Sequence, residues 1–329
     1  MKADIFIPTS NRLDALKQCL DSLNKQTLKD FTVILVGLEK DPKVEQLVKS
    51  YPNLLIIYIL QKEKGLIGAA NEALKIATNE IFVRLDDDVI LDEGWYENLI
   101  STYKSDEKIG GVTGPTTMSE KGLNSRDLTK YLENFRKSKN LLGKLLYWFY
   151  NGFLYENKLM EVSQFLDSGV FTIGSNYPSA RELKTLPEVS NLEACNWSGR
   201  RELCLKMGGF DTAYRKPGDY HEADAALKIK NMGYKLIFNP KVAVRHNVEI
   251  GTVTAVRPHS YYRTQNFIIF YFRYNKINSL LKLLRFLSNL CLQNSYYIVT
   301  SIKNRNIAPL AAIPGTFVGL VRVLIKYEN

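Results

Sequence analysis

The sequence predicts an α/β fold with a doubly wound sheet, and three observations support this class. Short apolar runs alternate with helical patterns across residues 3–85. A run such as Phe31–Val36 is nearly all apolar, which is typical of a parallel strand covered on both faces. Polar residues follow the ends of these runs, where open α/β sheets bind ligands. With 329 residues, 45% of them hydrophobic, the chain is long enough for a large core.

The first elements alternate between strand and helix. A strand over Ala3–Ile7 precedes a helix that carries leucines at helical spacing, from Leu13 to Leu23. Further strands are expected over Phe31–Val36, Leu54–Leu60 and Ile81–Leu85. Gly65–Gly68 forms a turn before a helix over Ala69–Ala77. This order predicts a sheet covered by helices.

The second half of the chain has shorter elements. Strands are expected over Val170–Ile173, Leu192–Trp197, Tyr234–Phe238 and Val242–His246, and helices over Gly199–Met207 and His221–Met232. The predicted organisation is one domain over residues 1–255, with halves of about 1–115 and 116–255, followed by a tail over residues 256–329.

Three consecutive carboxylates follow the fourth strand. Side chains alternate in an extended chain, so Asp86 and Asp88 would point one way and Asp87 the other. Two carboxylates on one side repel unless a cation lies between them, and hard oxygen ligands suit Mg²⁺ or Mn²⁺. The segment therefore predicts a metal–diphosphate site. The alternative is an acidic loop that caps the next helix, a role for which Asp92 is better placed.

A second acidic group begins the expected helix after residue 220. Glu222 lies in its first turn and is the best candidate for a general base that deprotonates an acceptor hydroxyl, with Asp224 and Asp219 as alternatives. An acidic first turn that stabilises only the helix is the other interpretation. His246 ends a strand and is a candidate third metal ligand, although a lone histidine is more often structural.

These segments together resemble the family 2 glycosyltransferases of the GT-A fold, including the rhamnosyltransferase-like and lipid-linked-glycan types. The resemblance covers roughly residues 3–250. It rests on Ile7–Arg12, Gly65–Asn71, Leu85–Asp88, Asn196–Asp211 and His221–Tyr234, which occur in the family's order. It implies a three-layer α/β/α catalytic domain, with an amphipathic helical region after it.

The resemblance also implies roles for individual residues. Asp86 would contact the nucleotide, Asp88 would bind Mn²⁺ or Mg²⁺, and Glu222 would stand where the family usually has an aspartate base. Transfer would invert the anomeric carbon by direct displacement of the nucleoside diphosphate. The expected substrate-binding residues are Pro8, Thr9, Asn11, Arg12, Glu39, Gly65, Asn71, Asp86, Asp87, Asn196 and Trp197.

Two positions depart from the family pattern. Gly37 stands where an aspartate commonly reads the nucleotide base, and Glu39 is the expected substitute. Ala70 replaces an arginine often found before Asn71. Both departures bear on the nucleotide contacts and on the identity of the base.

The tail concentrates the positive charge of the chain. The net charge is +10, and residues 251–329 contain ten basic residues and one acidic residue. Basic residues alternate there with apolar and aromatic ones, which favours an anionic membrane surface over simple packing on the domain. Nucleic-acid binding is not expected because no recognised motif is present. Leu141–Tyr150 is either a core helix or a second segment at the membrane interface.

The predicted activity is metal-dependent transfer of a sugar from a nucleotide sugar to a glycan or polyprenyl-linked acceptor. A non-catalytic adaptor on the same fold is the alternative, and residues 7–12 lack the glycine-rich loop that a nucleotidyltransferase would need. The four cysteines form no close pair, which indicates a reducing compartment. No signal peptide is expected, so the protein would lie on the cytoplasmic face of the membrane.

Overall fold

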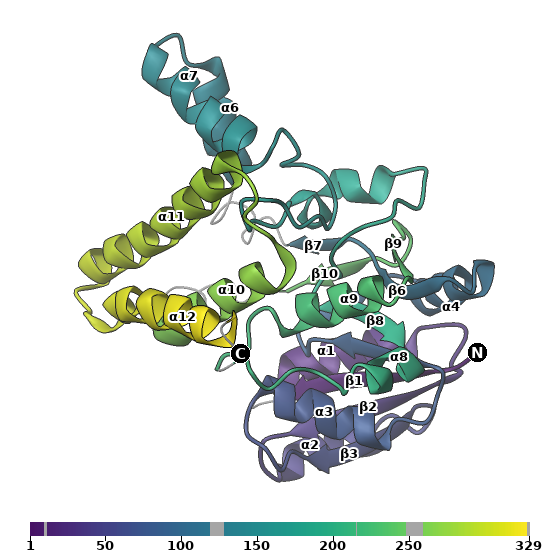
Figure 1. Ribbon diagram of the computed structural model, residues 1–329. Coiled ribbons are helices and arrows are strands. Elements are labelled where there is room, and N and C mark those ends of the chain that lie inside the picture. The colour runs from purple at the N-terminus through teal and green to yellow at the C-terminus, as the bar shows by residue number, and fades with distance from the viewer. Residues whose placement is uncertain (10–11, 119–127, 215, 248–258, 328–329) are drawn as a thin grey trace. The chain divides into compact units, whose positions relative to one another are not determined.

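The computed structural model describes residues 1–9, 12–118, 128–214, 216–247 and 259–327. These residues form two compact units. The sheet unit comprises residues 1–119, 175–213 and 221–248, and the helical unit comprises residues 120–174, 214–220 and 249–329. The helical unit is therefore larger than the expected tail after residue 255. It also includes residues 120–174 and 214–220, which group with the C-terminal helices (Figure 1).

A seven-stranded sheet forms the centre of the sheet unit, in the order β3-β2-β1-β4-β8-β6-β9. The strands are β1 (Ala3–Thr9), β2 (Phe31–Gly37), β3 (Leu55–Leu60), β4 (Ile81–Leu85), β6 (Ile109–Thr113), β8 (Asn196–Arg200) and β9 (Lys235–Phe238). β8 runs antiparallel to both its neighbours, and the other pairs are parallel. The carboxyl ends of β1, β2 and β4 therefore meet at one edge, as the sequence predicts.

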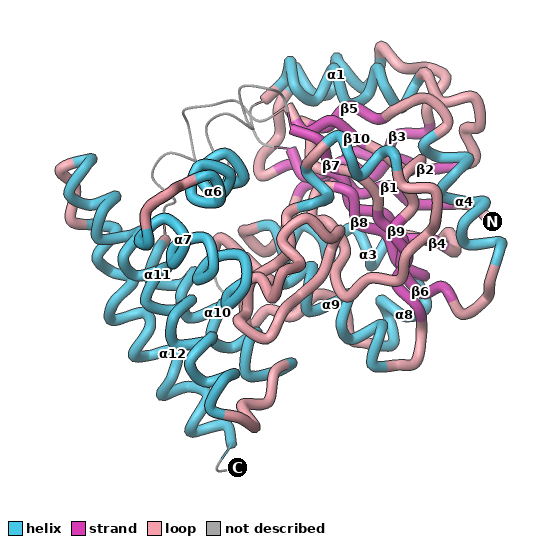
Figure 2. The backbone as a smooth tube through the Cα atoms, turned by 90° about the horizontal axis from the view of Figure 1, so that it is seen from above, coloured by secondary structure: helices cyan, strands magenta, loops and turns pink. Residues whose placement is uncertain are grey.

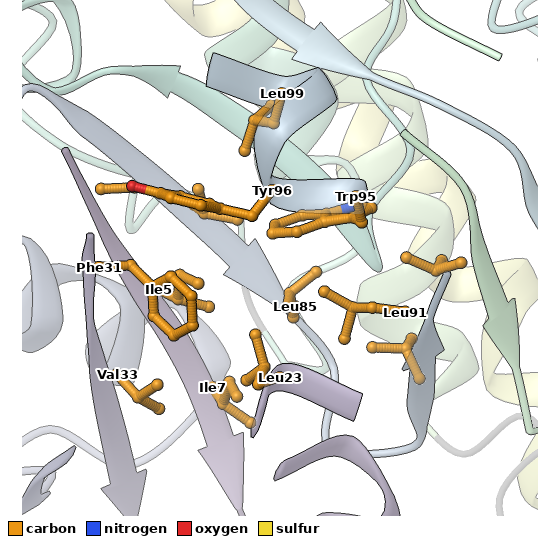
Figure 3. Close-up of a cluster of buried hydrophobic side chains, with 14 of the residues drawn as sticks. Ile5, Ile7, Leu23, Phe31, Val33, Leu85, Leu91, Trp95, Tyr96 and Leu99 are labelled. Carbon is orange, nitrogen blue, oxygen red and sulfur yellow. The ribbon is translucent and has the colours of Figure 1, made fainter. Parts of the chain in front are cut away.

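Helices cover this sheet on both faces (Figure 1). They are α1 (Leu13–Asn24), α2 (Pro42–Lys49), α3 (Leu66–Ile76), α4 (Trp95–Ser105), α8 (Arg201–Lys206) and α9 (His221–Asn231), with the 3-10 turns η2 (Gly174–Asn176) and η3 (Pro178–Glu182). Ile5 and Ile7 of β1 join the cluster that contains Leu23 of α1 and Trp95 of α4 (Figure 3). Phe6 points to the other face and stacks on Phe82 of β4.

A second, three-stranded sheet has the order β5-β10-β7. Its strands β5 (Val89–Leu91), β7 (Thr116–Met118) and β10 (Val244–His246) have three residues each. β5 begins directly after the aspartates that follow β4, and β10 pairs with it antiparallel. β10 therefore contains His246 of the predicted site, and β5 starts at the residue after Asp88.

The helical unit contains α6 (Leu128–Lys137), α7 (Leu141–Tyr147), the π-helix η1 (Trp148–Leu154), α10 (Ser260–Tyr274), α11 (Leu280–Asn304), η4 (Ala308–Ala311) and α12 (Ala312–Tyr327). Its core lies between α10 and α11, where Phe267, Tyr271 and Phe286 are buried. The Tyr271 and Phe286 rings stack with centroids 4.3 Å apart. Figure 2 shows α12 alongside α10.

Two local predictions are wrong, and the strand expected over Leu192–Trp197 is displaced, because β8 comprises Asn196–Arg200. Val170–Ile173 is not a strand, because the only pairing described there is an isolated bridge between Phe165 and Phe171. Asp92 does not cap α4, whose N-cap is Gly94 with φ of 70°. The carboxylate of Asp92 instead pairs with Arg181.

Candidate active site

The acidic segment lies at the carboxyl end of β4, between β1 and β8 in the sheet. Asp87 and Asp88 are buried, and the side chain of Asp86 is 25% exposed. Burying carboxylates costs several kcal/mol each unless they are paired, so the surroundings of these three side chains decide what they can do.

Strand pairing brings His246 to this segment. His246 of β10 is the register partner of Val89, and the backbone N–H of Asn247 donates to the carbonyl of Asp88 at 2.9 Å. Nε2 of His246 lies 3.2 Å from Oδ1 of Asp88. Ligand atoms of Asp86, Asp88 and His246 all lie within 4.8 Å of one another. The two carboxylates supply the hard oxygen ligands that Mn²⁺ and Mg²⁺ prefer, so they fit the predicted metal.

Arg12 forms ion pairs with two of the three aspartates. Its guanidinium pairs with Asp87, and Nη1 lies 2.6 Å from Oδ2 of Asp88. Burial, opposed by the charge of Arg12 and reinforced by Asp88 and Asp86, raises the pKa of Asp87 to about 6. Burial also acts to raise the pKa of Asp88, but His246 and Arg12 outweigh it and lower that pKa. Asp88 is thus kept as the anion that a cation needs.

A buried arginine connects this group to the predicted base. Nη1 of Arg84 lies 2.5 Å from Oε1 of Glu222, and its Nη2 lies 3.0 Å from Oδ1 of Asp86. The second oxygen of Glu222, Oε2, lies 3.0 Å from Nδ1 of His221. Burial acts to raise the pKa of Glu222, but interactions with His221 and Arg84 outweigh it and lower the pKa to about 2. Both carboxylate oxygens are therefore fixed in orientation.

Comparison with known proteins decides the family. Residues 4–204 match the model of Glycosyl transferase family 2. The chain belongs to this family. It is a glycosyltransferase, and its DxD-type aspartates Asp86 and Asp88 lie within the matched residues.

Individual relatives agree with this assignment. The glucosyl-dolichyl phosphate glucuronosyltransferase of Haloferax volcanii is 18% identical over 75% of this chain and 70% of that protein. The poly(ribitol-phosphate) β-glucosyltransferase of Bacillus spizizenii is 32% identical, over 40% of this chain and only 21% of that protein. The mannosyltransferase PcManGT of Pyrobaculum calidifontis, solved with GDP-Man and Mn²⁺, has a TM-score of 0.55 at 18% identity, covering 98% of this chain and 75% of that chain. The fold is accordingly GT-A.

In this glycosyltransferase, Asp224 is placed differently from Glu222. It is 1% exposed, and its Oδ2 lies 2.8 Å from Nζ of Lys228 one helical turn on. Lys228 also lies 3.6 Å from Asp211. The structure thus brings Glu222, and not Asp224, into the Arg84 network of the aspartates.

Three predicted substrate-binding residues make hydrogen bonds to the backbone of other segments of the sheet unit. Asn71 exchanges two hydrogen bonds with the backbone of Phe210, at 2.9 and 2.8 Å. Asn196 is buried, donates to the carbonyl of Val242 and accepts from Nε1 of Trp95. Trp197 donates to the carbonyl of Glu222 at 3.2 Å. Asn196 and Trp197 are 2% and 0% exposed, so they support neighbouring segments, and substrate contact by these three residues stays a prediction.

The remaining predicted residues lie at the ends of the first strands. Pro8 and Thr9 end β1, and Gly65, with φ of 117°, precedes α3. Glu39 follows β2 and is exposed. Asn11 lies outside the described residues.

The departure at Gly37 has a steric reason. A Cβ atom at this position would lie 2.6 Å from the Tyr58 hydroxyl, so the ring of Tyr58 fills the space of a side chain. Tyr58 donates to the carbonyl of Glu39 at 3.1 Å. An aspartate at position 37 would therefore require Tyr58 to move.

Sequence reasoning missed Arg84, although a signal was present. It is the one charged residue in the run Ile81–Leu85 and is 2% exposed. A buried arginine needs anionic partners, so its position in a central strand indicates nearby carboxylates.

Proposed function

We propose that this glycosyltransferase is metal-dependent and inverting, and that it transfers a sugar from a nucleotide-diphosphate sugar to a glycan or lipid-linked acceptor. The observation that carries the proposal is the grouping of Asp86, Asp88 and His246 within 4.8 Å at the end of β4. These residues would hold Mn²⁺ or Mg²⁺, with the donor's diphosphate completing the coordination. When bound, the cation supplies positive charge that stabilises the departing diphosphate.

Glu222 is the proposed base. Its carboxylate would accept the proton of an acceptor hydroxyl while that oxygen forms a bond to the anomeric carbon of the donor. The bond from that carbon to the diphosphate oxygen breaks, and its electron pair leaves with the nucleoside diphosphate. Arg84 and His221 orient the carboxylate but reduce its basicity, which fits proton removal late in the displacement. Asp224, already paired with Lys228, is the weaker candidate.

Arg12 is the proposed diphosphate contact beside the metal. Its side chain is 46% exposed, although its guanidinium pairs with Asp87 and Asp88. When a cation neutralises the aspartates, the guanidinium is free to bind phosphate oxygens. Pro8, Thr9, Asn11, Glu39, Gly65 and Asn71 would line the nucleotide side by the same proposal.

The helical unit supports a membrane-bound acceptor. Seven residues of α11 recur every three or four positions and are all exposed: Leu280, Leu284, Leu287, Cys291, Ser295, Ile298 and Ile302. Five of these seven are leucine or isoleucine, and Ile302 is 72% exposed. Exposed Lys144, Lys276, Lys303 and Arg305 accompany the apolar surface, and such basic residues suit anionic lipids.

The last helix extends this surface. Residues Ala308–Ile325 form an 18-residue stretch with mean hydropathy 1.8, long and apolar enough to cross a membrane, and 22% of it is buried. One face of α12 packs closely on α10, and the other exposes Ile313, Phe317 and Leu324. We infer that α12 lies along the cytoplasmic membrane surface, because a helix with one face against its own unit has only the other for lipid.

Binding and turnover measurements test this function. Calorimetric titration with UDP and GDP, each with and without Mn²⁺, would identify the base and the metal requirement. Proton NMR during incubation with the matching nucleotide sugar would follow its slow hydrolysis, and the first anomer released reports inversion or retention. Nucleotide binding that ignores Mn²⁺, or release with retained configuration, contradicts the proposal.

A further inference from the structure

The helical unit contains a cleft that the proposed chemistry does not use. Its volume is about 290 Å³, and it is lined by Asp219, Tyr220, Arg263 of α10, and Leu292, Gln293, Tyr296 and Tyr297 of α11. Sites for small ligands range from roughly 300 to 1,000 Å³. This cleft therefore has room for one small group.

The charge of the cleft favours a neutral ligand. Nη1 of Arg263 lies 2.5 Å from Oδ2 of Asp219, so the two charged side chains that line the cleft neutralise each other. The other lining residues are neutral at neutral pH. A site for a phosphate would present excess positive charge, as in arginine clusters.

The aromatic residues favour a sugar. Tyr296 is 43% exposed, and its ring meets that of Tyr297 edge to face with centroids 5.4 Å apart. A tyrosine ring offers a flat apolar face and a hydroxyl, which match the C–H face and hydroxyl groups of a pyranose. Gln293 adds an amide that can both donate and accept hydrogen bonds.

Tyr220 connects the cleft to the proposed base along the chain. It directly precedes His221 and Glu222, and its backbone has φ of 76°, a value bulky residues rarely adopt. Contacts with Phe270 and Phe267, at centroid distances of 5.2 and 6.0 Å, hold its ring. Asp219 precedes Glu222 by three residues, so the Cα atoms of these two residues are at most about 11 Å apart.

The cleft is also distinct from the apolar face of α11. Gln293 follows the exposed Cys291 by two residues, which is about 200° around a helix. One side of α11 thus carries the proposed lipid contacts, and another side carries the hydrogen-bonding groups of the cleft.

We propose that this cleft is an acceptor subsite that binds a neutral glycosyl residue. The proposal rests on the glycosyl transfer proposed above and specifies that the acceptor already contains a sugar. A bare polyprenyl phosphate would leave the cleft without a ligand of matching chemistry.

Saturation-transfer difference NMR on the full-length protein in detergent tests the subsite. The probes are methyl glycosides of glucose, galactose, mannose, rhamnose and N-acetylglucosamine, with inorganic phosphate as competitor. At least one glycoside should bind, and phosphate should not displace it. Tyr296→Ala should weaken that binding roughly three- to tenfold, whereas Tyr296→Phe keeps the ring face and should retain most of it. Tyr150→Ala removes a tyrosine of η1 that does not line the cleft, and serves as the matched control.

Any of three results would overturn the proposal. It is wrong if no glycoside binds at 50 mM, if binding is the same in Tyr296→Ala and wild type, or if phosphate displaces the sugar. Mn²⁺-dependent binding of UDP or GDP is measured on the same samples. If the wild-type protein shows no Mn²⁺-dependent nucleotide binding, the proposed function is contradicted. If it binds the nucleotide but no glycoside, only the subsite is contradicted.

Discussion

The sheet unit and the helical unit differ in the side chains that they bury and expose. The sheet unit buries charged side chains, with Arg84, Asp87, Asp88 and Glu222 all less than 9% exposed. The helical unit exposes apolar ones, including Leu280 at 70% and Phe317 at 69%. Each arrangement costs free energy in water unless a partner is present.

The difference indicates two separate kinds of partner. Buried, paired charges are preorganised groups whose strength depends on exclusion of water, which suits chemistry on a charged donor. Exposed apolar faces edged by lysine and arginine suit a lipid surface. Substitutions of the buried charged residues in the sheet unit should therefore abolish turnover and leave membrane binding intact, whereas substitutions on the exposed apolar faces of α11 and α12 should weaken membrane binding and leave nucleotide binding intact.

The largest effect is expected for Asp88→Asn. The change removes a charged ligand and leaves Arg12 and His246 with one anion fewer. We expect kcat/KM to fall by about 10³-fold or more, with loss of the response to added Mn²⁺. Asp14→Asn, an exposed acid on α1, is the control for loss of one charge. Unchanged metal dependence in Asp88→Asn would show that the cation binds elsewhere.

Glu222→Gln is expected to come next. The amide cannot accept the proton, so turnover should fall by about 10²- to 10⁴-fold while Mn²⁺-dependent nucleotide binding persists. Asp224→Asn should have a smaller effect on turnover, because Asp224 pairs with Lys228 outside the Arg84 network. The assay is single-turnover transfer with the donor found by titration. If Asp224→Asn loses more activity than Glu222→Gln, the two assignments must be exchanged.

Glu222→Gln should also change the pH dependence of the free energy of unfolding. The pKa of Glu222 is about 2 in the folded protein, below the ordinary glutamate value of about 4.3. A carboxyl group whose pKa is lower in the folded state stabilises the fold at pH values above its pKa in the unfolded state. That stabilisation is lost as the pH falls toward 2, the pKa in the folded state. It amounts to roughly 3 kcal/mol. Urea unfolding between pH 7 and pH 3 should therefore show a shallower pH dependence in Glu222→Gln than in wild type.

Much of the fold followed from the sequence because β1, β2, β3 and β4 are nearly continuous apolar runs that alternate with helical patterns. The candidate metal ligands Asp86, Asp88 and His246 were also named individually from the sequence. Their geometry was not predicted, because β5 and β10 have three residues each, too few to show a period. Only the pairing of these strands places His246 beside Asp88.

Membrane binding should respond to charge on the apolar face. Leu284→Glu and Phe317→Glu place an acid on an exposed apolar face of α11 and α12, respectively. Together they should weaken binding to anionic vesicles by roughly tenfold, measured by flotation without detergent. Nucleotide binding should be unchanged. A wild-type protein that remains at the bottom of the gradient would contradict the membrane surface altogether.

The final prediction concerns the packing of α12 on α10. Gly315 and Gly319 lie four residues apart on the face of α12 that meets α10. A Cβ at Gly315 would lie 2.3 Å from the carbonyl oxygen of Tyr261, a backbone atom that cannot move by a side-chain rotation. At Gly319 the nearest atom is a side-chain carbon of Ile268 at 3.0 Å. Gly315→Ala should therefore destabilise this packing by about 1–3 kcal/mol, and Gly319→Ala by less. Thermal unfolding of both variants, with exposed Phe317→Ala as the control, measures the difference. If both glycine variants unfold like wild type, α12 is not held on α10, and a membrane-spanning position becomes the better interpretation of its apolar sequence.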